Sequence, residues 1–85
     1  MNDDAIKDEV LRVLMHIVPE AQNETVNPGM TFRDQFEIDS LDFLNFVLTV
    51  ENALDVKVPE TAYPRLGTLD GAVEYLAVLL AEKVD

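Results

Sequence analysis

The stretch "FEIDSLDFLNFV", residues 36–47, holds a serine between acids at the start of an apolar helical pattern. Asp39 is suited to cap that helix, because its carboxylate accepts hydrogen bonds from the backbone N–H groups of a first turn. Ser40 then takes the first helical position, with its hydroxyl exposed at the positive end of the helix dipole. A phosphate group attached to that hydroxyl would be favourably placed, since helix N-termini suit anions. The alternative is that both residues only cap the helix.

The rest of the chain offers little catalytic chemistry. Nucleophilic serine catalysis needs a base within hydrogen-bond reach, but the only histidine, His16, lies off the apolar stripe of the first helix, where a solvated side chain is expected. A calcium-binding loop starting at Asp39 would place Leu41 and Phe43 where oxygen ligands are required. The absence of cysteine excludes thiolate metal sites, and no glycine-rich phosphate-binding motif occurs. We therefore predict no catalytic residue, no metal site and no enzyme activity.

Size and charge indicate a single small domain with protein partners. Eighty-five residues correspond to one domain, residues 1–85, with a modest core. Seventeen acidic and six basic residues give a net charge of −11, which repels nucleic acid and anionic lipid and attracts basic protein surfaces. The acidic N-terminal residues do not resemble a signal peptide, and no apolar run approaches the ~18 residues that span a bilayer. We expect a cytoplasmic monomer.

Three segments carry apolar residues at the three- and four-residue spacing of an amphipathic helix. They lie between Asp3 and Pro19, at about residues 40–54, and from the N-cap Thr68 through Leu80. Proline ends the first segment, because the residue before a proline is pushed out of the helical region. No segment alternates convincingly like a strand. The predicted fold class is all-α, a small bundle of three main helices plus one short helix.

Two connections join these helices. Residues 19–38 contain a turn signal, Asn27-Pro28-Gly29, and too many apolar residues for a free linker: Val26, Met30, Phe32 and Phe36. We therefore expect a loop pinned across the core. The segment "VPETAYPRLG", residues 58–67, is predicted to form the short helix, with Pro59 at its first position and Pro64 at its end.

The second helix has a wider apolar arc than one buried face requires. One side, which is expected to be buried, gathers Phe43, Phe46, Val47, Val50 and Leu54. A neighbouring leucine ridge consists of Leu41, Leu44 and Leu48. Two interpretations stay open: neighbouring elements cover both sets, or the leucine ridge is left partly exposed as a docking surface beside Ser40.

Residues 32–48, "FRDQFEIDSLDFLNFVL", combine an aromatic residue, an acidic stretch and D-S-L-D before an apolar helix. With "ENALDVKVPE", residues 51–60, and the last amphipathic helix, the chain resembles the acyl carrier protein family over nearly its full length. The resemblance implies that Ser40 receives a 4′-phosphopantetheine arm from coenzyme A, next to Asp39. A separate phosphopantetheinyl transferase would perform the transfer with magnesium, and the thiol of the arm would carry acyl groups as thioesters.

The resemblance also implies docking and cargo surfaces. Members of the family dock acids of the second helix on basic patches of acyl-transfer and synthase enzymes, and the matching acids here are Asp39, Asp42, Glu51 and Asp55. An acyl chain folded back between helices would lie near Phe43, Phe46, Val50, Val58 and Tyr63. Core packing explains the same five residues.

Several positions depart from the family pattern. Glu37 stands where glycine is usual, and Asn45 and Asn52 stand where glutamates are frequent on the docking face. These departures favour a dedicated carrier for specialised lipid or polyketide synthesis at least as well as a general carrier of fatty-acid synthesis. Two alternatives remain: an aminoacyl or aryl carrier of a nonribosomal-peptide-type pathway, and an unmodified acidic helical adaptor that uses the leucine ridge.

Overall fold

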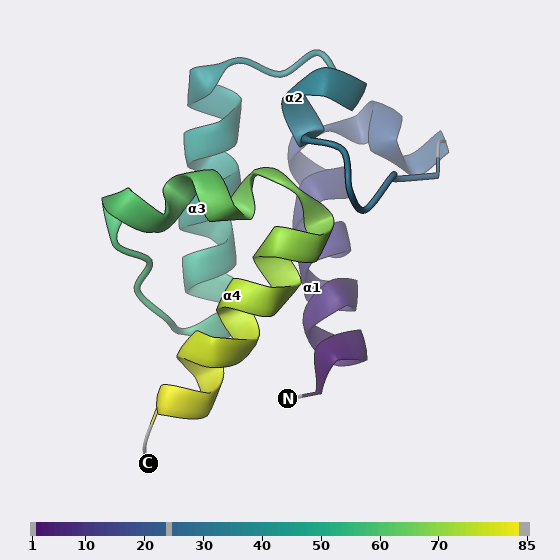
Figure 1. Cartoon of the computed structure of the whole chain (residues 1–85). Coiled ribbons are helices and arrows are strands. Elements are labelled where there is room, and N and C mark those ends of the chain that lie inside the picture. The colour runs from purple at the N-terminus through teal and green to yellow at the C-terminus, as the bar shows by residue number, and fades with distance from the viewer. Residues whose placement is uncertain (1, 24, 84–85) are drawn as a thin grey trace.

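Three long helices and three short ones make up the computed structural model, which describes residues 2–23 and 25–83 (Figure 1). In chain order they are α1 (Asp3–Ile17), the 3-10 helix η1 (Pro19–Asn23), α2 (Phe32–Gln35), α3 (Ser40–Leu54), the 3-10 helix η2 (Glu60–Gly67) and α4 (Leu69–Glu82). None of the residues described forms a strand. The predicted all-α class and the positions of the three main helices are confirmed.

Polar side chains begin the long helices. The Asn2 side chain accepts a hydrogen bond from the Ala5 amide (2.8 Å), and the Thr68 hydroxyl accepts one from the Gly71 amide (2.9 Å). Each cap gives a partner to a backbone donor that the helix itself leaves unsatisfied. The first helix ends at Ile17, ahead of Pro19, as the sequence predicts.

The core lies where α1 packs against both α3 and α4. In Figure 1, α1 and α3 run in opposite directions, and α2 lies at the end where α3 begins. Every buried side chain in the described ranges is apolar. The largest of those that are fully enclosed are Phe32, Phe46, Ile6, Leu14, Leu66 and Leu76. The predicted buried face of α3 is confirmed for Phe46, Val47, Val50 and Leu54.

The connection between α1 and α3 is more regular than predicted. It contains η1 and the single-turn helix α2, where the sequence indicated only a loop. The Thr31 hydroxyl caps α2 by accepting a hydrogen bond from the Asp34 amide (3.2 Å). A four-residue helix is too short to show apolar periodicity, which explains why the pattern did not reveal it.

This connection is nevertheless pinned across the core, as expected. Phe32 and Phe36 are buried, and the Phe32 ring meets the Phe46 ring edge-on, with 5.2 Å between centroids. The Asp70 amide donates to the Pro28 carbonyl (3.0 Å), which ties the turn to the first turn of α4. The expectation for Met30 was wrong: this residue, which directly follows the Asn27-Pro28-Gly29 turn, is 41% exposed.

The predicted short helix between α3 and α4 is present as η2, but its prolines are placed differently. Pro59 is the N-cap, and Pro64 lies inside the helix. A 3-10 helix accommodates proline, because its φ is close to −65° and only one donor is lost. At the following corner, a Cβ on Gly71 would lie 2.4 Å from the Arg65 carbonyl oxygen, so α4 approaches η2 as closely as a glycine allows.

Candidate functional site

The first turn of α3 is closed by reciprocal hydrogen bonds between two aspartates. The Asp42 amide donates to the Asp39 carboxylate (2.9 Å), and the Asp39 amide donates to the Asp42 carboxylate (3.2 Å). This capping box satisfies two backbone donors and fixes where the helix starts. The Asp39 cap was predicted. The return bond from Asp42 was missed, although the three-residue spacing of the two acids resembles the capping-box signature.

Ser40 is the first residue of α3 and the only serine in the chain. It is exposed, while the carboxylates on either side of it are directed at backbone amides. Its hydroxyl therefore lies at the positive end of a 15-residue helix, open to an approaching reagent. A phosphate-linked group attached here fits, because the helix N-terminus favours the negative charge that such a group brings.

In the part of the chain that the structure describes, Ser40 has no hydrogen-bonded side-chain partner. His16 is exposed on α1, as predicted. None of the side-chain hydrogen bonds found within residues 2–23 and 25–83 involves Ser40 or His16. The same ranges contain no cluster of His, Asp and Glu side chains able to hold a metal ion. The role of Ser40 as an attachment site stays a prediction.

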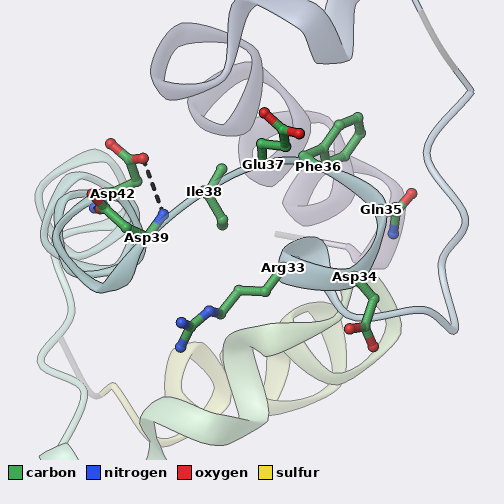
Figure 2. A pocket seen from close by; sticks show the side chains of 8 residues that line it. All are labelled: Arg33, Asp34, Gln35, Phe36, Glu37, Ile38, Asp39 and Asp42. Carbon is green, nitrogen blue, oxygen red and sulfur yellow. Dashed lines mark hydrogen bonds between the residues drawn. The ribbon is translucent and has the colours of Figure 1, made fainter.

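A depression of about 450 Å³ borders the start of α3 (Figure 2). Its lining carries one basic residue, Arg33, and four acidic ones: Asp34, Glu37, Asp39 and Asp42. In Figure 2 the Arg33 side chain extends from α2 toward the side where α3 begins, whereas Asp34 points away from it. The surface around Ser40 is therefore predominantly acidic, which suits a partner with a basic patch.

The leucine ridge of α3 is exposed to solvent. Leu41, Leu44 and Leu48 are 71%, 39% and 47% exposed. Of the two interpretations of the wide apolar arc, the second therefore holds for exposure: neighbouring elements cover the phenylalanine and valine face and leave the leucines uncovered. The ridge begins directly after Ser40, so a protein that reaches the serine meets the leucines as well. Their docking role stays a prediction.

Two further predicted docking acids, Glu51 and Asp55, also have intramolecular partners that the sequence did not reveal. The Glu51 carboxylate accepts a hydrogen bond from the Val58 amide (2.6 Å), which holds the connection after α3 against the helix. Asp55 ends α3 in the left-handed conformation, at φ 53°, and pairs with Lys83 at 3.0 Å. The Asp55 side chain is still 92% exposed, so the pair leaves it accessible to a partner.

The five residues near the predicted acyl site fall into two groups. Phe46, Val50 and Val58 are buried core residues. Phe43 and Tyr63 are partly buried and line a depression of about 470 Å³ between α2, α3 and η2. Core packing accounts for the first group. A contact with bound cargo stays a prediction for all five residues, of which Phe43 and Tyr63 line this open depression.

The sequence matches the family model described as a phosphopantetheine attachment site over residues 4–76. The chain belongs to the acyl carrier protein family. The prosthetic group of this family is 4′-phosphopantetheine, and the matched range includes α3 and the residues that cap it.

Relatives named acyl carrier protein align with most of the chain. The relative from Chlorobium phaeovibrioides is 28% identical, and the alignment covers 89% of this chain and 96% of the relative. Those from Myxococcus xanthus and Kocuria rhizophila are each 32% identical and align with 85% of this chain, covering 95% and 93% of their own lengths. Among the residues described, no helix combines the length and apolar character needed to cross a membrane.

Proposed function

We propose that this member of the acyl carrier protein family carries 4′-phosphopantetheine on Ser40 and shuttles acyl groups as thioesters between enzymes of fatty-acid, specialised lipid or polyketide synthesis. The observation that supports the proposal is the exposed Ser40 hydroxyl at the first position of a capped helix. Because the chain has no second serine, the family's attachment chemistry has one natural acceptor here.

In the loading reaction, the Ser40 oxygen is the nucleophile. It forms a new bond to phosphorus in coenzyme A, the P–O bond to the nucleotide part breaks, and the serine proton passes to a base. That base belongs to the transferase, since no basic side chain within the described ranges is hydrogen-bonded to Ser40. The contribution of this chain is to hold the hydroxyl outward at a fixed helix start. When bound, the group supplies the thiol that this cysteine-free chain lacks.

The partners we propose are a phosphopantetheinyl transferase (a holo-acyl-carrier-protein synthase) and the enzymes that load, extend or remove the acyl group. The acidic surface at the start of α3 and the exposed leucine ridge support a docking face for basic partner patches that also offer apolar contacts. We propose that the protein acts as a monomeric single domain in the cytoplasm and has no catalytic activity of its own.

Intact-mass measurement tests the attachment directly. After incubation with coenzyme A, magnesium and a broad-specificity transferase, the wild-type protein should gain the mass of one phosphopantetheinyl group. Ser40→Ala should gain none while keeping the wild-type helical spectrum and melting temperature. The matched control is Thr61→Ala, which removes an exposed hydroxyl on η2 and should be modified like wild type. Modification of the Ser40→Ala protein would overturn the assignment.

Two alternatives give different outcomes. An aminoacyl or aryl carrier would be modified in the same way, but would then be loaded by adenylating enzymes with amino or aryl acids and not by acyltransferases. An unmodified adaptor would use the exposed leucine ridge alone, and its mass would not change in the transferase assay. The mass measurement therefore separates carriers from adaptors, and a loading panel separates the two kinds of carrier.

A further inference from the structure

The depression between α2, α3 and η2 is lined by both apolar and polar side chains. Its apolar lining comes from Phe43, Tyr63 and Pro64, and its polar lining from Thr31, Arg33 and Asp34. Phe43 follows Ser40 by three residues, which is about 4.5 Å along a helix axis. A flexible group attached to Ser40 can therefore fold back over this depression without moving any element of the fold.

The depression does not continue into the core. Phe46 does not line it and is 1% exposed, and its ring centroid lies 6.2 Å from that of Phe43 and 5.2 Å from that of Phe32. Protein cores are packed at crystal-like density, so a long alkyl chain could enter here only by displacing these rings. The open volume of about 470 Å³ instead suits a short group that stays at the surface.

Arg33 gives this depression its chemical character. It lines both the Phe43–Tyr63 depression and the neighbouring one beside the capping box. The ion pairs found in the described part of the chain involve Arg12, Arg65 and Lys83, and none involves Arg33, although acids outnumber bases seventeen to six. Asp34 also lines the depression, but its side chain points away from that of Arg33 (Figure 2). The guanidinium is left to bind another anion.

From this arrangement we infer that the Phe43–Tyr63 depression holds a short acyl group whose far end carries a carboxylate, with Arg33 as its counter-charge. The inference rests on the proposed attachment at Ser40. A guanidinium presents two parallel N–H donors that match a carboxylate, and the aromatic and proline surfaces cover the methylene groups between thioester and carboxylate. Asp34 lines the same depression, and Glu37, Asp39 and Asp42 line the neighbouring one, so Arg33 is the one cation among the residues lining either of them and the group on which binding of a carboxylate depends.

The test compares two acyl groups of equal chain length. Glutaryl and pentanoyl groups are loaded onto Ser40 from their coenzyme A thioesters by the transferase, and mass spectrometry confirms one group per chain. The rate of thioester cleavage by hydroxylamine is then measured on the protein and on the free pantetheine thioester, which corrects for intrinsic reactivity. Because the Arg33 pair is exposed, we expect the protein to protect the glutaryl thioester about two- to fivefold more than the pentanoyl thioester.

Variants assign the effect to Arg33. Arg33→Met should abolish the difference between the two acyl groups, Arg33→Lys should keep part of it, and Lys57→Gln, which removes a cation elsewhere, should keep all of it. The backbone amide chemical shifts of residues 31–34, 63 and 65–67 should change on glutaryl loading in wild type and should not change in Arg33→Met. Equal protection of both groups, or an equal loss for both in Arg33→Met, would overturn the inference while leaving the attachment at Ser40 intact. Failure to load Ser40 at all would overturn both.

Discussion

The Glu51 carboxylate accepts a hydrogen bond from the Val58 amide at 2.6 Å, and so joins the last turn of α3 to the segment that leads into η2. Val58 is buried, so its amide has little access to water if the carboxylate is removed. We predict that Glu51→Ala lowers the free energy of unfolding by about 1–3 kcal/mol, because a buried donor loses its partner. Glu51→Gln, which keeps an acceptor oxygen, should cost clearly less. Denaturant titration gives both values, and equal losses would contradict a role for this bond.

At the corner between η2 and α4, we expect a glycine-to-alanine substitution to lower stability instead of raising it. In an exposed helix, replacing glycine by alanine gains about 1 kcal/mol from helix propensity. At Gly71, the new Cβ would meet the Arg65 carbonyl oxygen at 2.4 Å, a backbone atom that cannot swing aside. Gly71→Ala should therefore destabilise the protein by about 1–3 kcal/mol, as overpacked sites do. Gly67→Ala, where nothing lies within 4 Å of the new Cβ, should change stability little. A thermal melt of the two variants decides the question, and similar melting temperatures would refute the close approach.

We expect the exposed leucine ridge to slow the dissociation of a bound partner protein. Burying a leucine completely is worth roughly 1.5–3 kcal/mol, and Leu48 is 47% exposed, so a partner that covers it gains about half of that amount. Leu48→Ala should speed dissociation from the transferase roughly fivefold and leave association nearly unchanged. Val78→Ala removes a similarly exposed side chain from α4 and should change neither rate. Surface plasmon resonance measures both rates, with a melting curve for each variant. Unaltered dissociation of a folded Leu48→Ala protein would remove the ridge from the docking face.

We expect the acidic residues at the start of α3 to speed the association of a basic partner protein. Asp42→Asn removes a charge but keeps an oxygen that can accept the hydrogen bond from the Asp39 amide, so the helix cap should be retained. Exposed charges add little affinity individually, yet they speed encounter with an oppositely charged surface. We expect association with the transferase to slow about two- to threefold at low salt, and the difference to vanish at high salt as screening takes over. Asp8→Asn, an exposed acid on α1, is the control. A salt-independent effect of Asp42→Asn would point to a lost hydrogen bond instead of a lost charge.

The net charge of −11 predicts that salt stabilises the fold. Like charges oppose the compact state, and added ions screen their repulsion. The melting temperature of the protein should rise on addition of moderate sodium chloride or millimolar magnesium. The double variant Glu37→Gln/Glu60→Gln removes two exposed acids and should show a smaller rise over the same titration. A melting temperature that stays flat or falls with salt would show that repulsion does not limit stability.

Local sequence alone determined the long helices and the position of the candidate attachment site. Apolar spacing located α1, α3 and α4, and the capping preferences of Asp39 and Thr68 marked two of their starts. These signals are readable because helix periodicity and capping act over three or four neighbouring residues. The same local logic placed Ser40 at the first position of α3.

Tertiary structure decided which surfaces are available. The apolar pattern of α3 predicted that its valine face is buried, but it gave no way to tell that Leu41 and Leu48 are exposed, because coverage depends on where α1 and its neighbours lie. The Glu51 bond and the pairing of Asp55 with Lys83 join positions 7 and 28 residues apart, and such contacts leave no periodic signal in the sequence. The position of Arg33 beside Phe43 and Tyr63 likewise exists only once α2, α3 and η2 have packed together.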